Sequence, residues 1–152
     1  MRIVALLLIG AVACAAADRG GKQQVIAAVH RLFQDMAAGN GDGVAAAMLP
    51  EVKLISVRDG QISPASGRDE FVQRITASKG GLLERIWNPT VLVSGQMAML
   101  WADYDLHING KFSHCGVDAF FLLKTADGWK ISQVQYTAET QGCKPSPLGP
   151  VK

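Results

Sequence analysis

The stretch that decides the fold is residues 101–118, which read WADYDLHINGKFSHCGVD. In its middle stand Asn109 and Gly110, the dipeptide that two-residue type I′ hairpin turns prefer. Aromatic and aliphatic residues alternate with polar ones on both sides of this turn. The pattern predicts two long antiparallel strands, over residues 96–108 and 111–125.

The turn also predicts which residues face each other. With a two-residue loop, Ile108 pairs with Lys111, and uninterrupted pairing then places Trp101 opposite Asp118. Because side chains alternate along a strand, one face is predicted to carry Met97, Met99, Trp101, Asp103, Asp105, His107, His114, Asp118, Phe120 and Leu122. We expect this face to line an internal pocket, since carboxylates on a mostly apolar face need a reason to be there. The opposite face is also apolar, so we expect it to bind a second copy of the chain.

The segments before this hairpin predict three helices. Residues 22–38 place apolar side chains on one helical face. A short second helix over residues 43–49 is expected to stop at Pro50. The third helix opens at Ser66-Gly67-Arg68-Asp69, which resembles a capping box, and closes at Gly80-Gly81.

Three further strands complete the prediction. They cover residues 52–57, which lead into a turn at Asp59-Gly60, residues 82–93, with a bend near Asn88-Pro89, and residues 129–140. Helices followed by a four-strand meander indicate an α+β fold, in which the helices lie across one face of a curved, mainly antiparallel sheet.

The first 17 residues have the pattern of a secretory signal peptide. Met1-Arg2 precedes an apolar run over residues 3–12, and small residues stand before Asp18. Cleavage there would leave 135 of the 152 residues, enough for one domain. Lipidation at Cys14 is the alternative, and would tie the chain to a membrane. We expect the protein to be periplasmic or secreted.

The charges exclude some partners. The chain has 15 Lys and Arg against 13 Asp and Glu, with no block of one sign, so we expect neither nucleic acid nor an anionic membrane surface as a partner. We also expect no cofactor and no metal. Asp105, His107 and His114 could meet near the hairpin, but their spacing is not diagnostic of a metal site.

Cys115 and Cys143 are predicted to form a disulfide. An exported chain folds in an oxidising compartment, where two thiols tend to pair. The bond would close a segment of 28 residues and stabilise the fold by about 3–4 kcal/mol in the chain-entropy model. A nucleophilic Cys115 activated by His114 is disfavoured, because neighbouring strand residues point to opposite faces.

Several motifs carry a resemblance to a known family: Ala38-Gly39-Asn40, the Asp59-Gly60 turn, the helix start at residues 66–71, the hairpin from Trp101 to Phe120, and Asp127-Gly128-Trp129. Together they resemble a SnoaL-like domain of the nuclear-transport-factor-2-like (NTF2-like) superfamily, in particular its small secreted bacterial, lumazine-binding-like members. The resemblance implies a cystatin-like cone over residues 18–144, with an internal pocket and often a dimer through the outer sheet face. Residues 145–152 would be an irregular, proline-rich tail.

The resemblance leaves the function open, because the superfamily holds isomerases, dehydratases, cyclases, hydrolases and domains without known chemistry. Asp118 stands where ketosteroid isomerases carry an aspartate that helps to hold the oxyanion. The rest of that set is missing, since Leu32 replaces its tyrosine and Ser56 or Val57 its aspartate base. Activity of the ketosteroid isomerase kind is therefore not expected.

Three functions remain. The first is binding of a small, mostly apolar molecule in the cone, with ligand-binding candidates Trp101, Asp103, Met99, Phe120, Phe33 and His30. The second is an acid–base enzyme of isomerase, dehydratase or hydrolase type, with Asp118 and His114 as catalytic candidates. The third is a dimeric accessory protein whose pocket is vestigial. The first is preferred because the predicted face is apolar and no catalytic set is complete.

Overall fold

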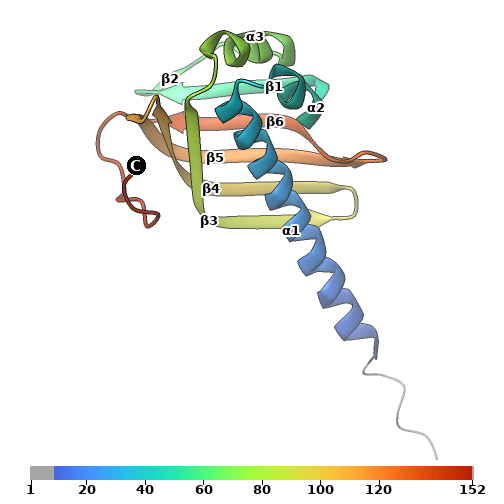
Figure 1. Cartoon of the computed structure of the whole chain (residues 1–152). Helices are drawn as coiled ribbons and strands as arrows, with labels where there is room; N and C mark the ends of the chain where they lie inside the picture. The colour runs from blue at the N-terminus through green and yellow to red at the C-terminus, as the bar shows by residue number, and fades with distance from the viewer. Residues whose placement is uncertain (1–8, 152) are drawn as a thin grey trace, which may run out of the picture.

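The computed structural model describes the backbone of residues 9–151, and side chains from Arg19 onward. Within this range three helices pack on one six-stranded sheet (Figure 1). The sequence analysis predicts the three helices and five of these strands, and it leaves out the two-residue strand over residues 61–62. The helices are α1 (Ile9–Ala38), α2 (Gly41–Ala47) and α3 (Arg68–Ser78). The strands are β1 (Met48–Arg58), β2 (Gln61–Ile62), β3 (Leu82–Ser94), β4 (Met97–Ile108), β5 (Lys111–Thr125) and β6 (Gly128–Ala138).

The sheet is mixed, with one parallel pair. Its strand order is β2-β1-β6-β5-β4-β3, and only β1 and β6 run parallel. The consecutive strands β3 to β6 form the predicted meander through short turns. Figure 1 shows α1 lying across one face of the sheet, with α2 and α3 near the β1 edge.

The apolar stripe of α1 is what attaches it to the sheet. Its buried side chains recur at helical spacing and are Val25, Ala28, Val29, Leu32, Phe33 and Met36. They join the core cluster with residues of the sheet such as Leu100 and Phe120. The predicted stripe included Ile26, which is only partly buried because it lies at the border of the packed face. The predicted signal peptide lies partly outside the described residues, at 1–8; the backbone of residues 9–17 is helical and continuous with α1.

Two local predictions about helix ends are wrong. The second helix ends at Ala47, three residues before Pro50, because the chain already enters β1 at Met48. Pro50 lies where the β1–β6 pairing is interrupted, which suits a residue without an N–H. The third helix has Gly67 as N-cap and no side-chain cap. Ser66 instead forms a backbone bridge with Leu54, and its Oγ accepts a hydrogen bond from Arg74 rather than from a backbone N–H of the first turn.

Both predicted irregularities of β3 and the hairpin are present. The β3–β4 pairing shifts between Trp87 and Thr90, and Asn88 there has a φ of 50°. At the tip of the β4–β5 hairpin, Asn109 has a φ of 51° and Gly110 a φ of 76°, as a type I′ turn requires.

The hairpin contains one feature that the sequence analysis missed, a β-bulge at Ser113. His107 pairs with Phe112, but the next pair is Leu106 with His114, so Ser113 is an extra residue on β5. From there on the register differs by one residue from the predicted one, and Asp118 lies opposite Ala102 rather than Trp101.

Side chains alternate along a strand, so a shift of one residue in the pairing moves residues of β4 and β5 that were predicted to share a face onto opposite faces. The even-numbered residues of both strands now share the face that the helices cover, and include Leu100, Ala102, Tyr104, Asp118 and Phe120. Met99, Trp101, Asp103 and Asp105 lie on the outer face with Cys115. The predicted grouping of Trp101 with Asp118 is therefore wrong.

The outer face near β3 and β4 carries the C-terminal segment. Cys115 and Cys143 form the predicted disulfide. Lys144 forms an ion pair with Asp103 at 3.1 Å, and Arg85 donates to the Gly149 carbonyl oxygen at 2.8 Å. These contacts hold the segment after β6 against the sheet, where Figure 1 shows it curling beside the start of β3.

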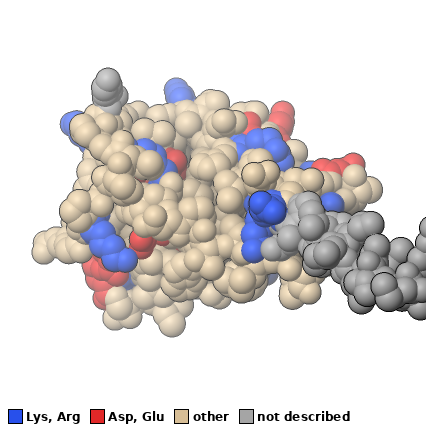
Figure 2. All heavy atoms as spheres, turned by 90° about the horizontal axis from the view of Figure 1, so that it is seen from below, with Lys and Arg blue, Asp and Glu red and all other residues tan. Residues whose placement is uncertain are grey.

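The described surface shows no extended block of charge from the side in Figure 2, which views the molecule from below Figure 1. Most of that surface is uncharged, and small groups of basic and acidic residues of both signs lie around it. Within residues 9–151, none of the helices combines the length and the apolar character needed to cross a membrane.

Candidate functional site

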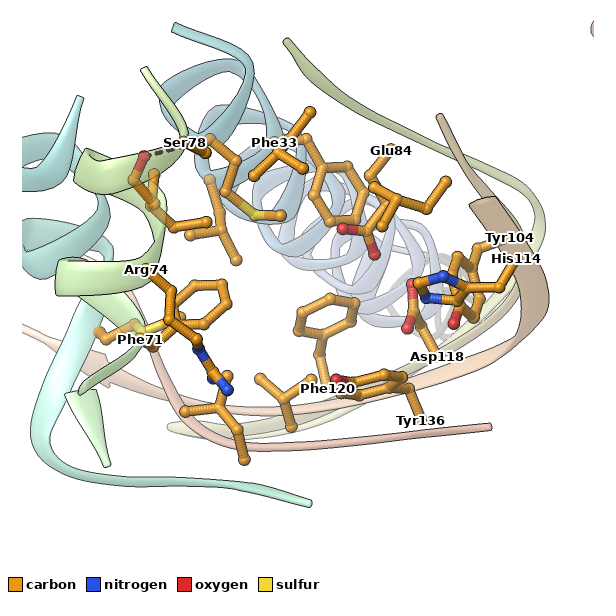
Figure 3. A pocket seen from close by; sticks show the side chains of 18 residues that line it. Phe33, Phe71, Arg74, Ser78, Glu84, Tyr104, His114, Asp118, Phe120 and Tyr136 are labelled. Atoms are coloured by element: carbon orange, nitrogen blue, oxygen red, sulfur yellow. Dashed lines mark hydrogen bonds between the residues drawn. The ribbon is translucent and has the colours of Figure 1, made fainter. Parts of the chain in front are cut away.

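The helix-covered face of the sheet encloses a cavity of about 340 Å³. Most of its wall is apolar. The apolar lining residues are Leu32, Phe33, Met36, Met48, Leu54, Phe71, Ile75, Leu82, Leu106, Phe120 and Val134. The polar lining residues are Arg74, Ser78, Glu84, Tyr104, His114, Asp118 and Tyr136. Figure 3 shows Glu84, Tyr104, His114 and Asp118 on one side of the space, with Arg74, Phe71 and Ser78 on the α3 side.

Glu84 and Asp118 form a pair of carboxyl groups in this wall. Glu84 lies on β3 and Asp118 on β5, the two strands that flank β4. Both residues lie on the helix-covered, inner face of the sheet. Asp118 is only 2% exposed, and its Oδ2 has no hydrogen-bond partner among the described residues. An unpartnered buried oxygen that faces a cavity is costly unless something in the cavity binds it.

Both carboxyl groups hold their protons unusually tightly. Burial raises the pKa of Asp118 well above its usual range, and the neighbouring carboxyl group of Glu84 raises it further. Burial also raises the pKa of Glu84, to about 7, although its interaction with Asp118 acts in the opposite direction. At neutral pH the pair therefore keeps at least one proton, and Glu84 can take up or release another.

Tyr104 forms the floor between these two acids. Its hydroxyl donates to the Thr137 carbonyl oxygen at 2.7 Å, and the side chain is 1% exposed. Burial and the charges of Asp118 and Glu84 raise the pKa of Tyr104, so it stays neutral. Tyr104 lies opposite Gly116 on β5, where a Cβ atom would collide with the Thr137 carbonyl oxygen. Glycine at this position thus allows the close approach of β6 that satisfies Tyr104.

His114 is a neutral neighbour of the acid pair. Burial, and then the charge of Arg58, lower the pKa of His114 below its usual value. Its Nδ1 is 2.9 Å from the Ser113 Oγ, the hydroxyl of the bulge residue, and its ring packs edge-on against Tyr104. The bulge therefore both turns His114 toward the cavity and supplies a partner for one of its ring nitrogens.

Four of the eight predicted site residues line the cavity, namely Asp118, His114, Phe33 and Phe120. Phe33 from α1 and Phe120 from β5 meet with ring centres 5.9 Å apart. They are where the sequence analysis expected them, because the α1 stripe and the parity of β5 were assigned correctly.

The other four predicted site residues lie elsewhere. Trp101 is 50% exposed on the outer face, and Met99 and Asp103 share that face because the bulge shifted the register. His30 is an exposed residue of α1 whose ring touches the edge of Phe33. It lies on the flank of the helix rather than on the buried stripe.

The acids of the outer face have cationic partners. Arg85 and Asp105 form a two-pronged, largely buried ion pair with N–O distances of 2.8 and 2.5 Å. His107 lies beside Asp105, whereas His114 belongs to the cavity. The three residues considered for a metal site therefore do not converge, and no group of three metal-ligating side chains occurs among the residues whose side chains are described.

Glu84, Tyr104, Tyr136 and Arg74 are the site residues that the sequence analysis missed. A signal existed for Glu84, which stands between Leu82 and Ile86 and shares their face in the strand predicted over residues 82–93. Tyr104 was assigned to the other face by the register error. For Arg74 and Tyr136 the sequence offers no signal, because their placement depends on how α3 and β6 close the cavity.

Comparisons with known proteins agree on the fold alone. No protein-family model matches the chain, and no curated protein matches it significantly. Solved structures do match. An NTF2-like protein of unknown function from Silicibacter pomeroyi is 18% identical, with a TM-score of 0.61 over 76% of this chain and 93% of that one. A proposed dehydratase of the NTF2-like family from Streptomyces avermitilis is 16% identical, with a TM-score of 0.65 over 79% and 96%.

A third structure, from Nostoc punctiforme, is a protein of unknown function with a cystatin-like fold. It is 14% identical, with a TM-score of 0.63 over 84% of this chain and 95% of that one. The arrangement of helices on a curved sheet thus occurs in proteins of very different sequence. This chain has the NTF2-like, cystatin-like α+β fold.

Proposed function

We propose that the protein binds a small, mostly apolar molecule in the cavity, with one polar end of that molecule at Glu84 and Asp118. The observation that carries this proposal is the unpartnered, buried Asp118 Oδ2 in the wall of an otherwise apolar space of about 340 Å³. A space of this size and polarity is typical of sites for small molecules. A ligand hydroxyl or carbonyl group could satisfy the acid pair, since protonated carboxyl groups both donate and accept.

The experiment is a thermal-shift titration with 4-phenyl-1-butanol, an apolar molecule with one hydroxyl end. Binding to the folded state should raise the melting temperature, and the rise should grow with the logarithm of the ligand concentration once this exceeds the Kd. Val134→Phe would fill part of the cavity and should abolish the rise, whereas Val117→Phe on the outer face should retain it. Circular dichroism checks that both variants fold. An unchanged melting temperature of the wild type at millimolar ligand would refute the proposal.

Acid–base catalysis is a second candidate, favoured by the pKa of about 7 for Glu84 and by the raised pKa of the neighbouring, buried Asp118. A group that titrates near neutral pH is suited to take a proton from a substrate, and a neutral acid can donate a hydrogen bond to the charge that develops. The pair is better suited to this than the predicted combination of Asp118 with His114, because His114 has one ring nitrogen occupied by Ser113. The proposed dehydratase of the same fold is compatible with such chemistry.

The two candidates differ in what Glu84→Gln does. If the site is catalytic, the variant should lose turnover of a substrate that it still binds, and the rate of the wild type should depend on a group with a pKa near 7. A variant that keeps full turnover would remove Glu84 from the mechanism.

Two further proposals concern the setting of the site. We propose that the chain is exported, on the basis of its signal-peptide pattern and the Cys115–Cys143 disulfide. We also propose a homodimer through the outer sheet face, where Met97, Trp101 and Phe121 are exposed beside a shallow apolar hollow. Light scattering on the wild type and on Trp101→Lys tests the dimer: a monomeric wild type would contradict it. Fractionation of the producing cells tests export.

A further inference from the structure

A second hollow adjoins the cavity on the side of α3. It has a volume of about 270 Å³, and it shares Leu54, Arg74 and Tyr136 with the cavity wall. Its own lining is more polar, with hydroxyl groups of Ser56, Ser63 and Ser66 and the carboxylate of Glu70. The two spaces therefore meet at Arg74, and the polarity of the wall changes there.

Most N–H donors of the Arg74 guanidinium make no hydrogen bond within the described residues. Its Nη2 donates to the Ser66 Oγ at 3.2 Å, and Nη1 lies 3.9 Å from a Glu70 oxygen, beyond hydrogen-bond distance. Both partners in the Glu70 pair are more than half exposed, so water weakens their attraction. A guanidinium has five N–H donors, and only one of them makes a hydrogen bond within the described residues.

The position of Arg74 is also supported. Its guanidinium packs over the Phe71 ring, 5.6 Å from the ring centre, and Ser66 ties it from the other side. Arg74 is the only Lys or Arg among the described residues that line the cavity. Figure 3 shows it reaching from α3 into the side of the cavity that lies across from Asp118.

The cavity is thus polar at two opposite places, with different chemistry at each. The side of Glu84 and Asp118 offers neutral hydrogen-bonding acid groups, and the α3 side offers a positive charge with a planar, forked set of donors. Phe33 and Phe120 lie between them, and Phe71 lies beside Arg74 (Figure 3). An occupant that matches all three regions has an apolar body, a hydroxyl or carbonyl group at one end and an anionic group at the other.

We infer that the ligand is a small apolar monocarboxylic acid whose carboxylate binds Arg74 at the junction of the two hollows. This inference deepens the proposed function and rests on it. A carboxylate matches the guanidinium fork, and a single negative charge suits the site because Glu70 stands nearby and repels a more highly charged group.

The experiment compares three molecules of one shape, 4-phenylbutanoate, 4-phenyl-1-butanol and 4-phenylbutylamine, by isothermal titration calorimetry at pH 6. At this pH the acid is ionised, while Glu84, with a pKa of about 7, is mostly protonated. The wild type should bind the acid roughly fivefold more tightly than the alcohol, as expected for a half-exposed charged hydrogen bond. The amine should bind most weakly.

Variants test whether Arg74 causes the tighter binding of the acid than of the alcohol. Arg74→Gln should bring the acid down to the affinity of the alcohol and leave the alcohol within twofold of the wild type. Arg74→Lys should keep part of the preference. Glu70→Gln should strengthen acid binding by about twofold, since it removes a neighbouring negative charge. Arg68→Gln, on the same helix but outside the cavity lining, is the matched control and should change nothing.

The outcomes separate the two proposals. If the alcohol binds but the acid binds no better, or if Arg74→Gln keeps the preference, the inference about the carboxylate is wrong and the proposed function stands. If none of the three molecules binds to the wild type, the proposed function is wrong and the inference fails with it.

Discussion

The two faces of β4 and β5 treat acidic side chains in opposite ways. On the outer face, Asp103 and Asp105 each have a cationic partner, Lys144 and Arg85. On the inner face, no ion pair among the described residues involves Asp118 or Glu84, and these two carboxyl groups lie next to each other instead. The outer acids therefore form ion pairs, whereas burial raises the pKa of both inner carboxyl groups.

The difference shows what each face is for. Paired ions on the outer face fasten the C-terminal segment to the sheet, together with the disulfide. An unpaired acid group in an apolar cavity costs stability and does nothing for the fold. Such a cost is typical of sites that bind or act on something else.

The largest expected contrast is between two neighbouring phenylalanines. Phe120 is 2% exposed on the inner face, and Phe121 is 36% exposed on the outer face. Phe120→Ala should lower the free energy of unfolding by about 3–4 kcal/mol, at the lower end for a core phenylalanine because the side chain already borders a cavity. Phe121→Ala should cost less than about 1 kcal/mol. Urea denaturation of both variants tests this, and equal losses would mean that the faces are assigned wrongly.

A smaller contrast is expected between two aspartates. Asp105→Asn removes the carboxylate that pairs with the largely buried guanidinium of Arg85. It should lower the free energy of unfolding by about 2–3 kcal/mol. Asp118→Asn should cost little at pH 7, or stabilise, because burial raises the pKa of Asp118 and so disfavours its ionised form in the folded state. Urea denaturation of the two variants at pH 7 gives the comparison. A loss at Asp118 as large as at Asp105 would show that Asp118 is ionised and paired.

The smallest expected effect is on the dependence of stability on pH. Glu84 has a raised pKa in the folded state, so between pH 4.5 and about 7 the folded protein binds more protons than the unfolded chain. Stability contributed by this group is therefore complete below pH 4.5 and lost as pH rises through about 7. Between pH 5 and pH 8, the free energy of unfolding of Glu84→Gln should fall by about 2 kcal/mol less than that of the wild type. Glu51→Gln, an exposed glutamate, serves as control and should follow the wild type.

Much of the fold could be predicted because it depends on local signals. The α1 stripe, the Asn109-Gly110 turn and the bend at Asn88 each follow from the preferences of a few adjacent residues, and the structure has all three. The predicted capping box at Ser66 is absent because Ser66 forms a backbone bridge with Leu54, twelve residues away, and so does not cap the helix. The prediction thus held where neighbours in sequence decide and failed where a distant strand does.

The candidate site shows the same division. Asp118, His114, Phe33 and Phe120 were expected in the pocket, and they line it. Trp101, Met99 and Asp103 were grouped with them only because the pairing was carried past Ser113 without interruption. Glu84 was missed because its partner lies two strands away, and no sequence spacing relates β3 to β5.

The sequence by itself determined the fold class, the three helices, the five longer strands, the disulfide and the alternation of side chains along each strand, since these depend on local preferences. Only the tertiary structure decided that β5 has a bulge at Ser113. The bulge determines whether the even-numbered residues of β5 share a face with the even-numbered or with the odd-numbered residues of β4. The physical reason is that a bulge costs little within the hairpin, while the packing of α1, Tyr104 and Phe120 on one side of the sheet selects the register. That packing brings Glu84 and Asp118 together.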